Sequence, residues 1–176
     1  IIGLGRMGEG MSRRMIKAGI EVHGYRNNYA KAQEQFEKGY ISGCTTSLES
    51  LVQVVHNGTG VLTETARTPG IFMMVVPAET VEDTLNELLS FCVEGDIIID
   101  HGNSNFKDSR RRAERLSKLG ISYIDCGTSG GVYGLERGYC LMVGGANHAV
   151  SVCAPIFRAL APGIGSAPRT DPTTRA

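Results

Sequence analysis

The chain has 176 residues, enough for one domain with a full hydrophobic core. Its 18 basic and 18 acidic residues give a formal net charge of zero, so general attraction to nucleic acid or to a membrane surface is not expected. No apolar run approaches the roughly 20 residues of a membrane span. The five cysteines are scattered and show no metal-ligand spacing, which predicts free thiols, no metal site and a cytoplasmic protein.

Short apolar runs alternate with amphipathic stretches in the first half of the chain, as is typical of βαβ units. The elements predicted here are the end of a strand at 1–3, a helix over 8–18, a strand over 21–25, and helices over 28–38 and 47–57. Asn28 and Ser47 are the expected N-caps of the last two helices. The segment 58–70 is rich in Gly and Thr and is predicted to be a surface loop.

The second half continues the alternation. Its predicted elements are strands over 71–76 and 96–100, helices over 80–92 and 108–119, strands over 121–125 and 139–143, and a helix over 148–160. The strand over 71–76 is continuously apolar, and that over 96–100 has three isoleucines between two aspartates, which indicates buried strands of a parallel sheet. We therefore predict a doubly wound, mostly parallel α/β sheet over 1–160, and a linker or truncated tail over 161–176. The basic run 110–118 is expected to be a solvated helix face.

A glycine motif lies between the first predicted strand and helix. The residues Gly3-Leu4-Gly5-Arg6-Met7-Gly8 match GxGxxG in the context that binds dinucleotides in a Rossmann fold. Gly3 would allow a tight turn, Gly5 would let a diphosphate approach the backbone, and Gly8 would let the helix pack closely. The helix N-terminus would offer free N–H groups to the diphosphate. An ordinary glycine-rich turn is the alternative.

The end of the second predicted strand bears on the choice of cofactor. An acidic residue there would accept hydrogen bonds from the ribose of NAD. The chain has Tyr25-Arg26-Asn27-Asn28 instead, and a guanidinium can pair with the 2′-phosphate of NADP. We therefore predict NADP, with NAD less favoured, and place Arg26 and Asn27 in the cofactor site. A solvated arginine without preference is the alternative.

Two polar loops are expected after strands, at 100–105 and 125–131. Both combine small residues with hydroxyl or amide groups, which can bind a polyol or an acid. Because open α/β sheets bind ligands at the carboxyl ends of their strands, these loops are candidate substrate contacts. Ordinary polar turns remain the alternative from the residues alone.

The chain resembles the 6-phosphogluconate dehydrogenases of the β-hydroxyacid dehydrogenase family, in particular their shorter, bacterial-type branch. The resemblance extends to about Thr170 and rests on the stretches 3–8, 74–78, 100–104 and 127–138. It implies that Val76, Pro77 and Ala78 line the cofactor. It also implies that Asn103 contacts cofactor and substrate near the nicotinamide, and that the substrate is further bound by Ser129, Gly130 and Gly131.

Two residues depart from the family pattern. His101 stands where the family commonly has Gly, and Arg26 stands where the bacterial-type branch has an acidic residue. A histidine at a loop tip is expected to be solvated rather than catalytic.

The resemblance implies oxidative decarboxylation of a phosphorylated sugar acid, 6-phosphogluconate, to ribulose 5-phosphate in the pentose phosphate pathway, with NADP as the oxidant. The family's catalytic lysine and glutamate lie on a helix beyond residue 176, in an all-helical domain absent from this chain. Lys107 and Lys118 do not fit that role, so no catalytic residue is expected here. The full-length protein is expected to form a homo-oligomer. Alternatives are another β-hydroxyacid dehydrogenase, of the 3-hydroxyisobutyrate type, and an NADP-binding module without catalysis.

Overall fold

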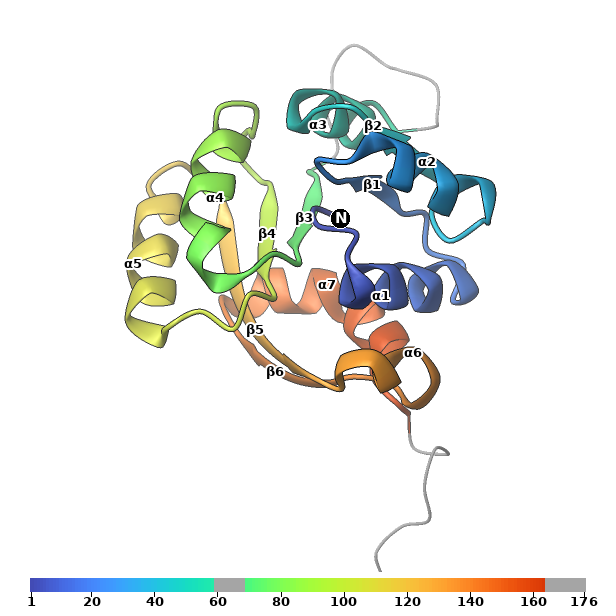
Figure 1. The fold of residues 1–176 in the computed structure, drawn as a ribbon. Helices are drawn as coiled ribbons and strands as arrows, with labels where there is room; N and C mark the ends of the chain where they lie inside the picture. The colour runs from blue at the N-terminus through green and yellow to red at the C-terminus, as the bar shows by residue number, and fades with distance from the viewer. Residues whose placement is uncertain (59–68, 164–176) are drawn as a thin grey trace, which may run out of the picture.

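A computed structural model of the chain describes residues 1–58 and 69–163. Helices and strands alternate along these residues (Figure 1). The strands are β1 (His23–Tyr25), β2 (Gly43–Thr45), β3 (Ile71–Met74), β4 (Ile97–Asp100), β5 (Ser122–Ser129) and β6 (Cys140–Gly144). The α-helices are α1 (Arg6–Lys17), α2 (Tyr29–Glu37), α3 (Leu48–Asn57), α4 (Val81–Leu89), α5 (Phe106–Ser117), α6 (Gly134–Arg137) and α7 (Asn147–Leu160), with single 3₁₀ turns at Ala78–Thr80 and Gly131–Tyr133.

The order in which successive strands are added to the sheet reverses at Ile2. This residue forms parallel bridges to Tyr25 at the end of β1 and to Met74 at the end of β3. It joins the pair β2-β1 to the group β3-β4-β5-β6, so that Ile2 lies between β1 and β3. All pairings are parallel except that of β5 with β6. The predicted doubly wound, mostly parallel sheet is therefore confirmed, and Ile2 marks the switch point at which such sheets bind ligands.

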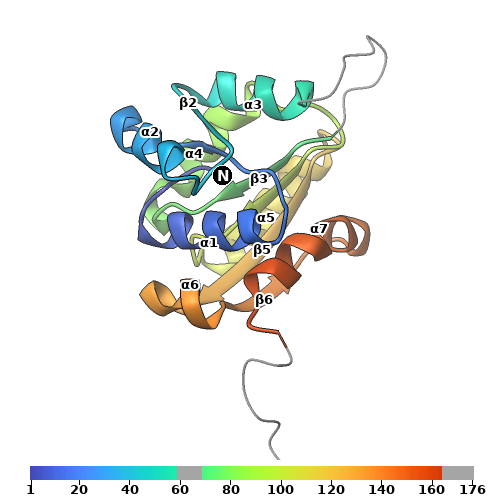
Figure 2. The same ribbon diagram turned by 90° about the vertical axis from the view of Figure 1, so that its right-hand side faces the viewer.

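Helices cover both faces of the sheet, because successive side chains of a buried strand point to opposite faces. Phe72 and Ile98 pack with α3, α4 and α5, whereas Met73 and Ile99 pack with α1 and α7. Figures 1 and 2 show α1 and α7 on one side of the sheet and α4 and α5 on the other. Each fully buried side chain of this size contributes about 1.5–3 kcal/mol.

Both predicted N-caps are confirmed. The side chain of Asn28 accepts a hydrogen bond from the Lys31 amide at 3.2 Å, and that of Ser47 accepts one from the Ser50 amide at 3.1 Å. The helix α1 begins earlier than predicted, at Arg6, because Gly5 is its N-cap. The second half of the glycine motif therefore forms the first turn of the helix.

The prediction of a loop over 125–131 is wrong for its first five residues. They belong to β5, which continues to Ser129 and pairs there with Cys140 of β6. Their small and polar side chains suggested a turn, but a strand that is half exposed tolerates them. The three-residue strand β2 and the four-residue helix α6 were not predicted.

Two predictions fall largely outside the described residues. These are the loop over 58–70, of which 59–68 are not described, and the tail over 161–176, of which 164–176 are not described. The domain boundary at residue 160 stays a prediction. Within residues 1–58 and 69–163, no helix is long and apolar enough to cross a membrane, and no group of three or more His, Cys, Asp or Glu residues is placed to hold a metal ion.

Candidate dinucleotide-binding site

A pocket of about 570 Å³ lies at the carboxyl ends of the strands, around the switch point. Three segments line it: the glycine loop, the turn between β1 and α2, and the segment from the end of β3 into α4. It brings together seven of the predicted cofactor residues, namely Gly3, Leu4, Gly5, Arg26, Asn27, Val76 and Pro77. The predicted residues outside its lining are Arg6, Met7, Gly8, Ala78 and Asn103. A smaller cavity of about 270 Å³ lies near the amino ends of the strands, around Ile1 and Ile71, away from the motif.

The three glycines of the motif are required for different reasons. Gly3 has a φ of +94°, and a Cβ there would lie 2.3 Å from the carbonyl oxygen of Val75. A Cβ on Gly8 would lie 2.0 Å from the carbonyl oxygen of Gly3, so the first turn of α1 packs directly on the loop. A Cβ on Gly5 would meet nothing within 4 Å. Two glycines therefore make the loop compact, and the third leaves its pocket side open.

The N-terminus of α1 is available to an anion. Gly5 is the N-cap of this 12-residue helix, and no side chain caps it. The first N–H groups of a helix lack intrahelical acceptors, and the helix dipole adds a partial positive charge at that end. Since Gly5 also lines the pocket, the site can hold the diphosphate of a dinucleotide.

Arg26 is held against the glycine loop. Its Nη1 donates to the carbonyl oxygen of Leu4 at 2.9 Å, and Gln35 Nε2 donates to the same oxygen at 3.2 Å. This contact orients the guanidinium in the pocket wall, and a guanidinium has further N–H donors for a ligand. Asn28 lines the pocket as well, but its side chain is already used as the cap of α2.

The opposite wall of the pocket was missed by the sequence interpretation. It consists of polar residues of the 3₁₀ turn and α4: Thr80, Asp83, Thr84 and Glu87. The buried residues of α4 are Val81, Leu85 and Leu88, which pack on the sheet. The polar spacing of i, i+3, i+4 and i+7 was visible in the sequence, and it places these residues on one face of the helix.

The two candidate substrate segments lie side by side. Asn103 adopts the left-handed backbone conformation with a φ of +53°, and its Oδ1 accepts a hydrogen bond from the Thr128 amide at 3.1 Å. This contact joins the loop after β4 to the end of β5, one residue before Ser129. Gly130 and Gly131 follow with φ values of +137° and +48°, which favour glycine.

The expectation of a solvated His101 is wrong. The side chain is only 3% exposed, because the loop folds back on β5 and brings His101 Nδ1 to 2.8 Å from Thr128 Oγ1. The Thr128 hydroxyl donates its single proton to the Cys126 carbonyl at 2.9 Å, so His101 Nδ1 must carry a proton and act as donor. Burial lowers the pKa of His101 to about 4, and the ring is therefore neutral at pH 7. Its buried Nε2 has no hydrogen-bond partner in the described part of the chain.

A buried carboxylate supports the loop that carries Asn103. Asp100 accepts hydrogen bonds from the Gly102 amide at 2.7 Å, the Ser104 hydroxyl at 2.6 Å and the Tyr123 hydroxyl at 2.5 Å. Arg112 Nη1 lies 3.5 Å from Asp100 Oδ2. The prediction of a solvated basic face is thus wrong for Arg112, which is 5% exposed, because its charge neutralises a buried acid.

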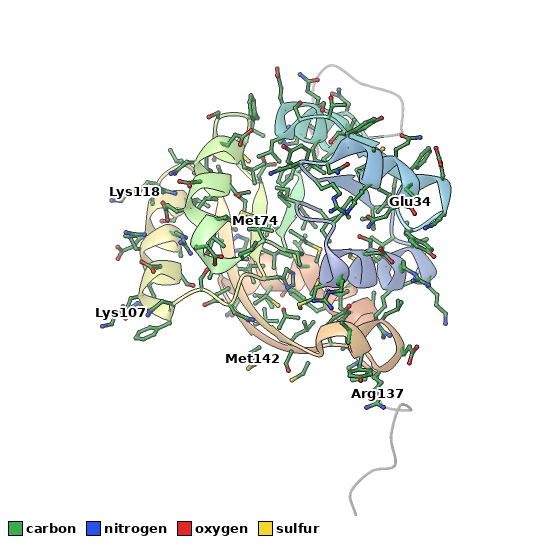
Figure 3. All side chains as sticks on the ribbon, in the orientation of Figure 1. Glu34, Met74, Lys107, Lys118, Arg137 and Met142 are labelled. Atoms are coloured by element: carbon green, nitrogen blue, oxygen red, sulfur yellow. The ribbon has the colours of Figure 1, made fainter. Side chains whose placement is uncertain are left out.

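The lysines of α5 lie away from this region. Figure 3 shows Lys107 and Lys118 near the two ends of the helix, pointing outward, whereas Met74 lies inside the fold beside the switch point. Both lysines are exposed. The expectation that neither serves as a catalytic base stays a prediction.

Comparison with known proteins places this site in a family. A family profile described as the NAD binding domain of 6-phosphogluconate dehydrogenase matches residues 1–167. An NAD(+)-dependent, decarboxylating 6-phosphogluconate dehydrogenase of Haloferax volcanii is 36% identical over 163 residues, which cover 93% of this chain and 50% of that protein. The chain spans about a third to a half of the length of the curated relatives it matches.

Two solved structures share the fold. A 6-phosphogluconate dehydrogenase of Plasmodium falciparum superposes with a TM-score of 0.78 at 24% identity, covering 95% of this chain and 34% of that one. A 3-hydroxyisobutyrate dehydrogenase of Salmonella typhimurium superposes with a TM-score of 0.73 at 22% identity, covering 91% of this chain and 52% of that one. Together with the profile match over 1–167, the pocket and its glycine loop identify the chain as a member of the NAD-binding domain family of 6-phosphogluconate dehydrogenases.

Proposed function

We propose that the chain is the cofactor-binding part of an NADP-dependent dehydrogenase that converts 6-phosphogluconate to ribulose 5-phosphate with loss of CO₂. The observation that carries this proposal is the pocket at the switch point, where an uncapped helix N-terminus and an open Gly5 lie beside Arg26. The first two groups suit a diphosphate, and the third suits a 2′-phosphate.

Each wall has a separate task in this proposal. The glycine loop and α1 bind the diphosphate, and Val76 and Pro77 bound the pocket beyond it. Asn103 and residues 129–131 hold the sugar acid through amide, hydroxyl and backbone groups. The nicotinamide, when bound, supplies the hydride acceptor. The chain itself contributes binding and orientation, and the proton-transfer groups belong to the segment beyond residue 176.

The choice of NADP is tested by changing Arg26 in the purified full-length protein. The dissociation constants of NADP and NAD are measured at matched salt for the wild type and for Arg26→Asp. A charge-assisted hydrogen bond contributes about 1.5–3 kcal/mol, so the ratio of affinities should move toward NAD by about ten- to a hundredfold. Arg110→Asp, on the exposed face of α5, makes the same change of charge away from the pocket and serves as control. An unchanged ratio in Arg26→Asp would remove the argument for NADP.

A second candidate activity is oxidation of 3-hydroxyisobutyrate, because the fold also matches that of a 3-hydroxyisobutyrate dehydrogenase over most of the chain. Turnover of the full-length protein with each acid separates the two. A higher kcat/KM for 3-hydroxyisobutyrate than for 6-phosphogluconate would replace the first proposal. The homo-oligomeric state of the full-length protein and its cytoplasmic location stay predictions.

A further inference from the structure

The wall opposite Arg26 carries uncompensated negative charge. Asp83 and Glu87 line the pocket from α4, and both are exposed. Among the described residues neither has an ion-pair partner. Among the described residues that line the pocket, Arg26 is the only basic one. With Asp83 and Glu87 it gives the lining a net charge of −1.

The acidic side chains on the two faces of α4 differ in how far they are paired with cations, as the neighbouring residue Glu82 shows. Its carboxylate lies 2.8 Å from Arg112, 3.0 Å from Arg115 and 3.2 Å from Arg111. These contacts lower the pKa of Glu82, the hydrogen bond from Arg112 being the largest cause. The acid that faces α5 is therefore neutralised by three cations, whereas the two acids that face the pocket are not.

The chemistry of the two dinucleotides differs at one position. NADP carries a 2′-phosphate, which has a charge of about −1.5 to −2 at pH 7 and accepts hydrogen bonds. NAD has a 2′-hydroxyl there, which can donate a hydrogen bond to a carboxylate. Negative charge across the pocket therefore repels the first group and tolerates or binds the second.

We propose that Asp83 and Glu87 are specificity-determining residues that oppose the effect of Arg26, so that the site accepts NAD as well as NADP. This inference rests on the proposed function, since it concerns the same dinucleotide pocket. Arg26 attracts the 2′-phosphate from one wall, and the two carboxylates repel it from the other. The preference for NADP is then smaller than Arg26 alone would produce.

The test uses fragments of the cofactors that differ only in the group of interest. Binding of 2′,5′-ADP and of 5′-AMP to the full-length protein is measured by calorimetry for the wild type, Asp83→Asn, Glu87→Gln and the double variant. Surface charges interact through a high dielectric and are screened over a Debye length of about 8 Å, so each substitution should tighten 2′,5′-ADP about threefold and the pair about tenfold. Affinity for 5′-AMP should stay level or fall. Glu114→Gln, on the exposed side of α5, removes the same charge away from the pocket and should change neither probe.

The outcomes separate the inference from the proposed function. The inference is supported if the Asp83 and Glu87 variants bind 2′,5′-ADP more tightly than the wild type, if this increase in affinity becomes smaller at 0.5 M salt, and if Glu114→Gln binds like the wild type. Salt should reduce the increase because screening weakens a repulsion between exposed charges. An unchanged ratio of the two probes in the double variant at low salt overturns it and leaves the dinucleotide site in place. If the wild type binds neither probe and neither NAD nor NADP, the proposed function itself fails.

Discussion

Alanine substitutions at Gly5 and Gly8 should separate the folding role of the glycine loop from its binding role. In Gly8→Ala the new methyl group lies 2.0 Å from the carbonyl oxygen of Gly3, and the obstacle is backbone, which cannot rotate away as a side chain would. In Gly5→Ala the methyl group meets no atom within 4 Å, at a residue that lines the pocket. The first substitution should therefore damage the fold, and the second should damage only the binding of a dinucleotide.

The magnitudes follow from opposing terms. Alanine in place of glycine inside a helix stabilises it by up to about 1 kcal/mol. Overpacking typically costs about 1–3 kcal/mol, and a contact this short between α1 and the loop belongs at or above the upper end. We expect a net loss of about 1–3 kcal/mol for Gly8→Ala, which lowers Tm by about 3–10 °C in a domain of this size. At the N-cap position alanine is less favourable than glycine, typically by about 1 kcal/mol, so Gly5→Ala should lose no more than about that amount.

Thermal unfolding and calorimetric titration of the same three proteins test this reasoning. Gly5→Ala should melt close to the wild type while binding NADP and NAD at least about tenfold more weakly, because the methyl group fills the space above the helix N-terminus. If Gly8→Ala melted at or above the wild-type temperature, the close packing of α1 on the loop would be refuted. If Gly5→Ala bound both dinucleotides normally, the diphosphate would not lie at this loop.

Three further predictions concern the loop after β4. Burial lowers the pKa of His101 from 6.5 to about 4, so the ring stays neutral in the folded protein while the unfolded chain takes up a proton below pH 6.5. The free energy of unfolding, measured in urea, should therefore be constant above pH 6.5 and fall by about 3 kcal/mol towards pH 4. His101→Gln should lose this part of the pH dependence. Arg112→Ala should cost about 3–5 kcal/mol in the same assay, because it removes the cation beside the buried Asp100 carboxylate; equal stability of the two proteins would contradict this role of Arg112. Asn103→Gly should keep the left-handed backbone, lose about 1–3 kcal/mol of stability with the hydrogen bond to the Thr128 amide, and weaken substrate binding in the full-length protein, whereas Asn103→Val should be destabilised further; unchanged substrate affinity in Asn103→Gly would remove Asn103 from the site.

Elements determined by local chemistry could be predicted from the sequence. The strands β3 and β4 are apolar on both faces because helices cover both sides, and Asn28 and Ser47 cap their helices through contacts only three residues away. The same holds for the glycine loop, whose sequence context of strand, turn and helix is contiguous.

Features that depend on distant partners could not be predicted. The end of β5 resembles a turn in sequence, and it becomes a strand because β6 pairs with it along an edge. His101 resembles a solvated loop residue, and it is buried because Thr128 of the next strand accepts its hydrogen bond. In both cases the local residues permit several structures, and the tertiary contact selects one of them.

The dinucleotide pocket has one wall that local sequence predicts and another that depends on distant contacts. This difference bears on how the site selects its cofactor. Arg26 directly follows β1, so the residue that we propose to lie next to the adenosine ribose can be found by counting from the glycine motif. The α4 wall lies beyond Pro77, and it faces the ligand only because Val81, Leu85 and Leu88 hold the opposite side of the helix on the sheet. Arg26 alone accounts for the attraction of a 2′-phosphate but not for its repulsion by Asp83 and Glu87. In the site that we propose, both act on one 2′-substituent, so the selectivity would be a difference between two walls that neither wall determines by itself.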